Sequence, residues 1–286
     1  MDINSKTKTI CLIGNPVEHS LSPNIHNYLF EKYDINMKYL CFKVENTNLK
    51  EAIQGVKSLG IKGCNITIPH KVEVMKFLDD IDKNAKLIGA VNTIENKNGK
   101  LIGYNTDGIG FVKSILDKGY KIKDKNIMIL GAGGACRSIA VELASKGARK
   151  MEIRNRSLES AKKIKTIIKD NFDTEICISS EKIEREDLEQ IDIIINTTPI
   201  GMDKDRENCP IDEDIYVSKD LLVCDIVYKP HETKFLKWAK KNNLDIVHGI
   251  DMLVNQAIYG FYIWTKIKPL EEENIKKILR GISLEK

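Results

Sequence analysis

The 286-residue sequence lacks three features that would assign it to a special class of proteins. No apolar run approaches the roughly 18 residues that a membrane-spanning helix needs, so no transmembrane segment is predicted. The polar start, residues 1–8, has no apolar segment of the kind that a signal peptide contains. No Cys-x-x-Cys pair occurs, and we therefore predict neither a zinc site nor another metal site.

Excess charge of one sign and a disulfide pattern are also missing. The net charge of +4, from 45 basic and 41 acidic residues, is too small to predict a strongly basic face. We therefore expect neither nucleic acid nor a membrane surface as a partner. The seven cysteines are odd in number and widely scattered, which does not suit a disulfide framework. This pattern is typical of the reducing cytosol and predicts a cytoplasmic protein.

What the sequence does contain is an alternation of strand-like and helix-like segments. Such alternation predicts an α/β fold with largely parallel sheets, and a chain of this length usually forms two domains. The predicted strands are residues 9–13, 37–44, 61–68, 91–95, 100–104, 127–130, 151–154, 191–196, 221–226 and 244–248. The predicted helices are one from Ser22, one ending at Ala144, and 49–59, 158–169, 249–264 and 275–279. We expect Ser22 to cap its helix and Asn98-Gly99 to form a hairpin turn.

The segment Gly131-Ala132-Gly133-Gly134-Ala135 lies between a predicted strand and a predicted helix. In this context a glycine-rich turn binds a dinucleotide, because one glycine makes the tight turn and another lets the backbone approach the pyrophosphate. Cys136 follows and is small enough for close packing of helix against strand. The alternative, a glycine-rich turn that only joins two packed elements, stays open.

The end of the next predicted strand indicates which nicotinamide cofactor binds. An NAD site usually has Asp or Glu there for the ribose 2′-hydroxyl, whereas this chain has Asn155, Arg156 and Ser157. No carboxylate would repel a 2′-phosphate, and the Arg156 guanidinium could pair with it, with help from Arg154. Arg156 could instead be an ordinary solvated arginine. We predict NADP as the cofactor.

Small polar residues gather at several predicted strand ends in the first half of the chain. They lie in residues 19–23, 65–71, 91–93 and 105–107. Asn65 and Thr67 point to the same side of their strand, since side chains alternate with period two. Ser20 and Ser22 precede a helix N-terminus, where an anionic group is favoured. The set predicts a small polyhydroxylated acid as substrate, although each residue alone could serve a turn or a cap.

An enzyme that uses a nicotinamide cofactor to oxidise a secondary alcohol must also move a proton to or from the alcohol oxygen. Lys71 and Asp107, each at the end of a strand-like segment, are the candidates for this proton transfer. His19 and His70 lie near the same motifs and are rivals, although a lone loop histidine is more often structural.

Taken in order along the chain, these segments resemble the shikimate dehydrogenase family. The matching residues are 14–16, 19–23, 25–27, 65–69, 71, 89–93, 103–108, 131–135, 155–157, 196–202, 225–230 and 249–257. The resemblance implies an NADP-dependent enzyme that reversibly reduces 3-dehydroshikimate to shikimate in chorismate and aromatic amino acid biosynthesis. It also implies a small-molecule substrate as the partner and a monomer or homodimer.

The resemblance further implies a role for each matching residue. Lys71 corresponds to the acid–base residue and Asp107 to its orienting partner. The residues that correspond to the substrate site are Ser20, Ser22 and Tyr228 around the carboxylate, and Asn65, Thr67, Asn92 and Gln256 around the ring hydroxyls. Those that correspond to the cofactor site are Gly131, Ala132, Gly133, Gly134, Ala135, Asn155, Arg156, Ser157, Thr197, Gly249 and Met252.

The domain organisation also follows from the resemblance. It implies a discontinuous substrate-binding and catalytic domain, a Rossmann-like NADP-binding domain, and an active-site cleft between them. The expected bounds are 1–107 with 249–286 for the first domain and 108–248 for the second.

Two positions bear on cofactor and substrate preference. Many NADP-using members of the family have a second arginine where this chain has Ser160, which predicts a weaker or looser preference for NADP. Ser22 is as expected for shikimate, whereas a threonine there resembles quinate-accepting relatives.

Two alternatives stay open: a broader quinate/shikimate dehydrogenase using NAD or NADP, and a non-catalytic nucleotide-binding paralogue. The presence of both Lys71 and Asp107 argues against the second.

Overall fold

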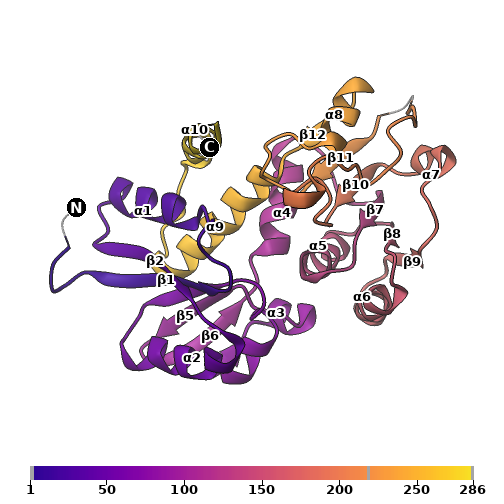
Figure 1. Cartoon of the computed structure of the whole chain (residues 1–286). Helices are drawn as coiled ribbons and strands as arrows, with labels where there is room; N and C mark the ends of the chain where they lie inside the picture. The colour runs from indigo at the N-terminus through magenta and orange to yellow at the C-terminus, as the bar shows by residue number, and fades with distance from the viewer. Residues whose placement is uncertain (1–2, 218–219, 285–286) are drawn as a thin grey trace. The chain divides into compact units, whose positions relative to one another are not determined.

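The chain forms two compact units, each built around its own sheet (Figure 1). The computed structural model describes residues 3–217 and 220–284. The first unit extends to Thr106 and includes Gln256–Gly281, and the second contains Asp107–Asn255 and the chain from Ile282. The expected bounds of the cofactor domain, 108–248, differ from the second unit mainly over residues 249–255. The function assigned to each domain stays a prediction.

The first unit contains a mixed six-stranded sheet. Its strands are β1 (Lys8–Gly14), β2 (Met37–Lys43), β3 (Gly63–Ile66), β4 (Asp80–Ile81), β5 (Thr93–Lys97) and β6 (Lys100–Tyr104), in the spatial order β2-β1-β3-β5-β6-β4. β1 is parallel to β2 and β3, whereas β5 is antiparallel to β3 and β6. Between β5 and β6, Asn98 and Gly99 have φ of 54° and 86°. This confirms the predicted hairpin, because its tight turn needs positive φ at both positions.

Helices cover both faces of this sheet. On one face, α2 (Leu49–Ser58) and α3 (Lys83–Ile88) pack over a cluster that includes Cys11 and Ile13 of β1. On the other face lie α1 (Ser22–Lys32) and the last turns of α9 (Gly249–Thr265), which is followed by α10 (Glu272–Leu284). Because both faces are covered, the four consecutive residues from Ile10 to Ile13 are all buried.

The second unit contains a six-stranded sheet in which every paired strand is parallel. Its strands are β7 (Asn126–Leu130), β8 (Lys150–Arg154), β9 (Glu175–Ser179), β10 (Ile193–Asn196), β11 (Leu222–Asp225) and β12 (Ile246–Val247), in the order β12-β11-β10-β7-β8-β9. The chain builds one edge from β7 to β9 and then returns beside β7 to build the other. This is the doubly wound order of a Rossmann fold, and it confirms the predicted fold class.

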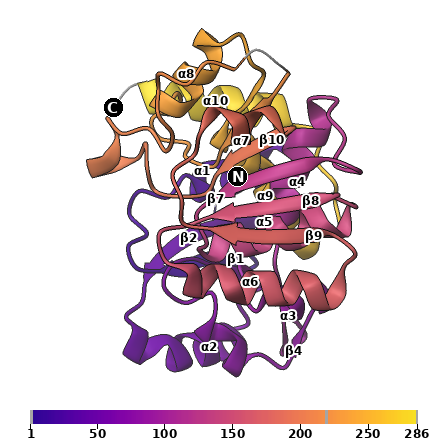
Figure 2. The ribbon, with the colours of Figure 1, turned by 90° about the vertical axis from the view of Figure 1, so that its right-hand side faces the viewer.

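Helices also cover both faces of the second sheet. α4 (Asp107–Asp117), α5 (Gly134–Ser145) and α6 (Leu158–Asn171) pack side by side, with α6 along β9 (Figure 2). α7 (Arg185–Glu189) and α8 (Lys234–Lys241) supply apolar residues to a cluster with β7, β10 and β11. In that cluster Met128 and Leu130 of β7 pack with Phe235 and Trp238 of α8.

Several local features differ from the sequence-based expectation. Ser22 does not cap α1: the helix begins at Ser22, and Leu21 occupies the cap position. The Ser20 hydroxyl instead accepts a hydrogen bond from the Ser22 amide at 3.2 Å. The sequence did not predict β4, β9, α3, α4, α7, α8 or the short 3-10 helices Asn46–Asn48, Glu73–Phe77 and Asp203–Asp205.

Candidate active site

Lys71 and Asp107 both lie just beyond the ends of strands. Lys71 follows β3 in a turn, and its carbonyl accepts a hydrogen bond from the Val91 amide at 2.8 Å, which fixes its backbone beside the start of β5. Asp107 is the first residue of α4 and is only 7% exposed. The N-terminal end of the helix stabilises a carboxylate there. Both residues make further polar interactions, and their catalytic roles stay predictions.

The two rival histidines have different surroundings. The His70 ring is 1% exposed, and its Nε2 lies 2.7 Å from the carbonyl oxygen of Val44. Since a carbonyl can only accept, Nε2 carries the proton and donates it, and this bond ties the turn after β3 to the end of β2. His19 is exposed in the loop before α1. The structural role of His70 favours Lys71 for proton transfer.

Three predicted substrate residues, Asn65, Asn92 and Gln256, belong to one hydrogen-bonded network in the first unit. Asn65 Nδ2 donates to the Asn92 carbonyl at 3.1 Å and to Thr93 Oγ1 at 3.0 Å. Asn92 Nδ2 donates to Thr106 Oγ1 at 3.0 Å, and Thr106 Oγ1 donates to Gln256 Oε1 at 3.5 Å. Apart from Gln256, every member is less than one-tenth exposed. Buried polar groups that satisfy one another in this way hold fixed orientations.

Tyr39 of β2 also belongs to this network. Its hydroxyl donates to Asn65 Oδ1 at 2.7 Å. Burial raises the pKa of Tyr39 well above its usual value, and the Ser22 side chain opposes the rise. Ser20 Oγ accepts a hydrogen bond from the Ser22 amide, so the two predicted serines lie together. The three predicted amides lie together in the network, and Tyr39 holds the Asn65 side chain.

The other two predicted substrate residues are Thr67, in the first unit, and Tyr228, in the second. Thr67 follows β3 and packs against Gly14, where an added Cβ would come within 2.2 Å of Thr67 Cγ2. The Thr67 amide also donates to the Ile13 carbonyl at 3.0 Å. Tyr228 follows β11 in the second unit and is half-buried. Contact of either residue with a substrate stays a prediction.

The glycine-rich turn after β7 has the local geometry that a dinucleotide requires. Gly131 has φ of +99°, and a Cβ there would lie 2.9 Å from Thr197 Oγ1 and 3.0 Å from Thr198 Cγ2. At Gly133 and Gly134 a Cβ would meet nothing within 4 Å, so these two residues face open space. No side chain caps the N-terminus of α5, and its first amides can therefore bind an anion. The flanking residues Ala132 and Ala135 are half-buried.

The turn after β8 presents the predicted 2′-phosphate residues. The Asn155 amide donates to the Ser179 carbonyl at 3.0 Å, and Asn155 Nδ2 donates to the Ser157 carbonyl at 2.6 Å. These two bonds shape the turn, and they leave Arg156 and Ser157 exposed. An exposed guanidinium on a shaped turn is suited to pair with a phosphate.

Arg154 does not take part in this turn, and the suggestion that it assists Arg156 is wrong. Its side chain is 9% exposed and forms ion pairs with Glu152 and, at 2.9 Å, with Asp187. It also donates to the carbonyls of Glu181 and Lys182, each at 3.3 Å. With these partners the guanidinium holds the segment after β9 in place.

The remaining predicted cofactor residues lie after β10 and at the start of α9. Thr197 Oγ1 donates to the Leu130 carbonyl at 2.7 Å and so lies beside the glycine-rich turn. Burial raises the pKa of the Cys136 thiol to about 12, and the Thr197 side chain opposes the rise. Gly249 begins α9, where an added Cβ would come within 2.5 Å of the carbonyls of Ile226 and Val227. Met252 is half-buried one turn later.

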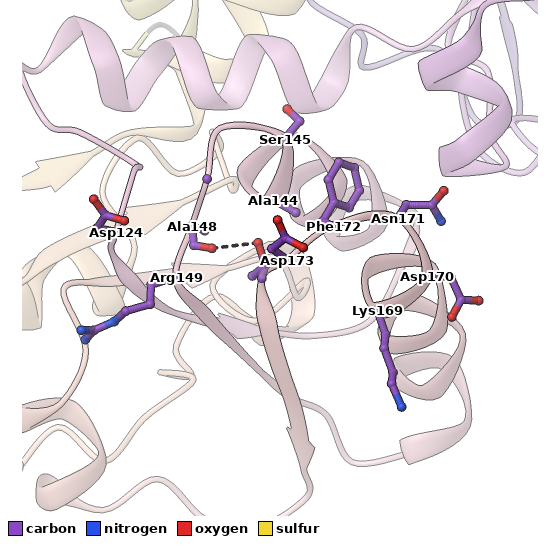
Figure 3. Close-up of a pocket in the computed structure, with 12 residues that line it drawn as sticks. Asp124, Ala144, Ser145, Ala148, Arg149, Lys169, Asp170, Asn171, Phe172 and Asp173 are labelled. Carbon is purple, nitrogen blue, oxygen red and sulfur yellow. Dashed lines mark hydrogen bonds between the residues drawn. The ribbon is translucent and has the colours of Figure 1, made fainter.

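A pocket of about 610 Å³ lies elsewhere on the second unit (Figure 3). Its lining includes Asp124, Arg149 and Thr174, which lie one or two residues before β7, β8 and β9. The pocket is therefore at the amino ends of these strands, and two of its lining residues are joined by a hydrogen bond of 2.7 Å from Thr174 Oγ1 to the Ala148 carbonyl. The glycine-rich turn lies at the carboxyl ends, where parallel sheets bind nucleotides. This pocket is not the predicted cofactor site.

Residues 3–217 and 220–284 contain no helix that is both long and apolar enough to cross a membrane. Within the same ranges, no group of three or more His, Cys, Asp or Glu side chains could hold a metal ion. The seven cysteines are free thiols.

The sequence reasoning gave no role to Tyr39, Thr93 or Thr106, which connect the predicted residues. Thr93 and Thr106 lie inside motifs that the sequence analysis singled out, so their place in the site could have been predicted. Nothing in the sequence indicated Tyr39, because a tyrosine in a β-strand is ordinary. Only the fold reveals that its hydroxyl points at Asn65.

Comparisons with known proteins agree with this architecture. Models of the shikimate dehydrogenase substrate binding domain, of shikimate/quinate 5-dehydrogenase and of the shikimate 5′-dehydrogenase C-terminal domain match residues 12–94, 111–204 and 249–280, respectively. The NADP(+)-dependent shikimate dehydrogenase of Methanocaldococcus jannaschii is 48% identical over 271 residues. That similarity covers 93% of this chain and 94% of the relative.

Solved structures are similar over nearly the whole chain. Shikimate 5-dehydrogenase from Listeria monocytogenes, in complex with shikimate and NAD, has a TM-score of 0.91 at 33% identity, covering 98% of each chain. The ligand-free 5-ketofructose reductase of Gluconobacter sp. strain CHM43 has a TM-score of 0.89 at 33% identity, covering 98% of this chain and all of the other. With three family models matched in order and a relative 48% identical over most of its length, the chain belongs to the shikimate dehydrogenase family of oxidoreductases.

Proposed function

We propose that this protein catalyses the reversible, NADP-dependent reduction of 3-dehydroshikimate to shikimate. The proposal rests above all on the buried network that joins Tyr39, Asn65 and Asn92 in a chain of this family. Hydroxyls and amides with fixed orientations suit a small acid that carries several ring hydroxyls. In this family the reaction serves the biosynthesis of chorismate and the aromatic amino acids.

The substrate carboxylate is proposed to bind at Ser20 and Ser22. Ser22 is the first residue of α1, an 11-residue helix whose N-terminus carries no side-chain cap. Hydroxyl donors beside such a terminus stabilise an anion through hydrogen bonds and the helix dipole. Asn65, Asn92 and Gln256 are proposed to bind the ring hydroxyls of the same substrate.

Proton transfer is assigned to Lys71. As the ring ketone is reduced, its oxygen gains negative charge and takes a proton from Lys71 Nζ, which leaves a neutral amine. Asp107 is assigned the role of hydrogen-bonding and orienting this lysine. A nearby carboxylate favours the protonated lysine that the reductive direction needs.

The residues of the second unit fit a dinucleotide. The tight turn at Gly131, the open space at Gly133 and Gly134, and the amides of α5 suit a pyrophosphate. Arg156 suits a 2′-phosphate, since a guanidinium pairs bidentately with phosphate oxygens. NADPH, when bound, supplies the hydride that the reduction requires.

Initial rates of the purified protein test the proposal. Shikimate, quinate and the sugar 5-ketofructose, each with NADP or NAD in its matching redox form, are compared by the absorbance of reduced nicotinamide. We expect strong turnover of shikimate with NADP and little turnover of quinate or 5-ketofructose. Comparable kcat/KM for quinate or NAD would indicate a broader quinate/shikimate dehydrogenase. No turnover with any pair would contradict the proposal and favour a non-catalytic paralogue.

A cytoplasmic location and a monomeric or dimeric state belong to the same proposal. The scattered cysteines support the first. Light scattering coupled to size exclusion, at micromolar concentration, tests the second: a mass above that of a dimer would contradict it.

A further inference from the structure

One buried carboxylate lies where three segments of the second unit meet. It belongs to Asp225, the last residue of β11, which is fully buried and to which the sequence reasoning gave no role. The three segments are the turn 197–201 after β10, the loop 226–232 after β11, and the start of α8. The turn contains Thr197 and the loop contains Tyr228, so each of these two segments carries a residue predicted to bind cofactor or substrate.

The turn after β10 is held by Asn196, which pairs with Asp225 across the sheet. Asn196 Nδ2 donates to Asp225 Oδ1 at 3.0 Å and to the Ile200 carbonyl at 3.1 Å. Asn196 Oδ1 accepts from the amide and from the hydroxyl of Thr198, at 3.0 and 2.7 Å. Since a carbonyl can only accept, these bonds fix which way the Asn196 amide faces, and one buried side chain links the carboxylate to the whole turn.

The loop after β11 and the start of α8 bind the same carboxylate. The Val227 amide donates to Asp225 Oδ1 at 2.9 Å, and the Thr233 hydroxyl donates to Asp225 Oδ2 at 2.7 Å. Because its hydrogen is committed to the carboxylate, Thr233 Oγ1 accepts from the Leu236 amide at 3.3 Å and caps α8. Thr233 also packs on the turn after β10, since a Cβ at Gly201 would lie 2.9 Å from Thr233 Cγ2.

The three donors around Asp225 require an acceptor that carries no hydrogen. Burial raises the pKa of the Asp225 carboxyl to about 6, and its three hydrogen bonds oppose the rise. Well above that pH the carboxylate is ionised and accepts from every donor. An isosteric amide would place an NH2 group either opposite the Thr233 hydroxyl or opposite the two nitrogen donors, so at least one donor would lose its acceptor.

We propose that Asp225 is a positioning residue, whose carboxylate fixes the turn that carries Thr197 and the loop that carries Tyr228 in one arrangement. This inference rests on the proposed function of the protein. A misplacement of about 1 Å at an active site can cost about 100-fold in rate. The glycine-rich turn and Arg156 make none of these bonds, and they should still bind their parts of the dinucleotide when Asp225 is changed. Loss of the carboxylate should therefore impair catalysis more than cofactor binding.

The test compares Asp225→Asn with the wild type well above pH 6 and well below the Tm of each protein. We expect kcat for shikimate oxidation to fall about 10- to 100-fold. The Kd for NADPH, measured by nicotinamide fluorescence, should stay within about threefold, which is less than 1 kcal/mol. Asp212→Asn is the matched control: Asp212 also accepts from a nearby amide, that of Asp214 at 3.1 Å, but it is exposed, and its substitution should leave both constants unchanged.

Variants of Thr233 separate this role from stability. Thr233→Val removes the hydroxyl at nearly constant shape, so it should lower the Tm through the lost cap and also lower kcat about 3- to 10-fold. Thr233→Ser retains the hydroxyl and should keep kcat within about twofold of the wild type. In the Asp225→Asn protein, Thr233→Val should lower kcat by no more than about a further twofold, because the two residues act through one bond.

Either of two results would overturn the proposal: a near-normal kcat in the Asp225→Asn protein, or an equal loss of kcat in Thr233→Ser and Thr233→Val. Should Asp225→Asn fail to fold, the two Thr233 variants still decide, because a lower Tm with an unchanged kcat in Thr233→Val would show a merely structural role. Absence of shikimate turnover by the unmodified protein would instead contradict the proposed function, so the two failures are distinguishable.

Discussion

Gly131 and Gly133 offer a paired test of the glycine-rich turn. An alanine side chain would clash with neighbouring atoms at the first position and would fit without contact at the second. Gly131 has φ of +99°, and its Cβ would lie 2.9 Å from Thr197 Oγ1 and 3.0 Å from Thr198 Cγ2. Gly133 has φ of −82°, which alanine adopts readily, and its Cβ would meet nothing within 4 Å. One substitution should therefore strain the fold, and the other should only fill the space proposed for the pyrophosphate.

The magnitudes follow from these geometries. A non-glycine residue forced into such backbone angles costs about 1–3 kcal/mol, and the two close contacts put Gly131→Ala toward the upper end. For a unit of this size, 1 kcal/mol corresponds to about 2–4 °C, so we expect the Tm to fall by about 4–12 °C. Gly133→Ala should change the Tm by less than about 1 °C.

In the kinetic measurements, Gly133→Ala should impair NADP binding specifically, although it leaves the stability of the fold unchanged. Gly133→Ala should raise the KM for NADP at least about tenfold, or about 1.4 kcal/mol, because the added methyl holds the pyrophosphate away from the backbone. The KM for shikimate should stay within twofold. Thermal denaturation and initial-rate kinetics on the same preparations measure both quantities. A Gly133→Ala protein with an unchanged KM for NADP, or a Gly131→Ala protein with an unchanged Tm, would refute the reasoning.

Two other substitutions test separate parts of the molecule. Arg156→Gln should raise the KM for NADP about 10- to 150-fold and leave the KM for NAD unchanged, since a hydrogen bond to a charged group contributes about 1.5–3 kcal/mol. Arg185→Gln, at an exposed arginine of α7 paired with Glu189, is its control, and equal effects on NADP and NAD would contradict the role of Arg156. His26→Phe should stabilise the protein increasingly as the pH falls. Burial lowers the pKa of His26 from 6.5 to about 3, so between these values the unfolded chain binds a proton that the folded chain does not. The wild type should therefore lose up to about 1.4 kcal/mol per pH unit relative to His26→Phe below pH 6.5, as followed by urea denaturation; a difference independent of pH would contradict this.

The elements that the sequence predicted well are those whose signal is local. The glycines at 131–134 mark a strand–turn–helix by their backbone freedom alone, and Asn98-Gly99 specifies its hairpin for the same reason. β7 and β10 are short apolar runs, as doubly covered strands must be. By contrast, β4 has two residues and α7 has five, too few for a periodic pattern to be visible.

The site was predictable as a set of residues but not as a network. Asn65 was found because small polar residues are unusual at strand ends, whereas the hydrogen bond that fixes its side chain comes from Tyr39, which belongs to a different strand. Arg154 shows the opposite error. Its neighbour Arg156 suggested a shared role, but the acidic Glu152 and Asp187 that neutralise Arg154 are brought to it only by the fold.

The most direct test of the account measures kcat for dehydroshikimate reduction with NADPH in the wild type, Lys71→Ala and Lys76→Ala. Lys76 is an exposed lysine nearby that pairs with Glu73 at 2.8 Å, and it serves as the control. Acid–base catalysis contributes about 10²- to 10⁴-fold, so Lys71→Ala should lower kcat by that factor with a small change in KM, while Lys76→Ala stays active. A Lys71→Ala protein with near-normal kcat would contradict the proposed chemistry and return attention to His19.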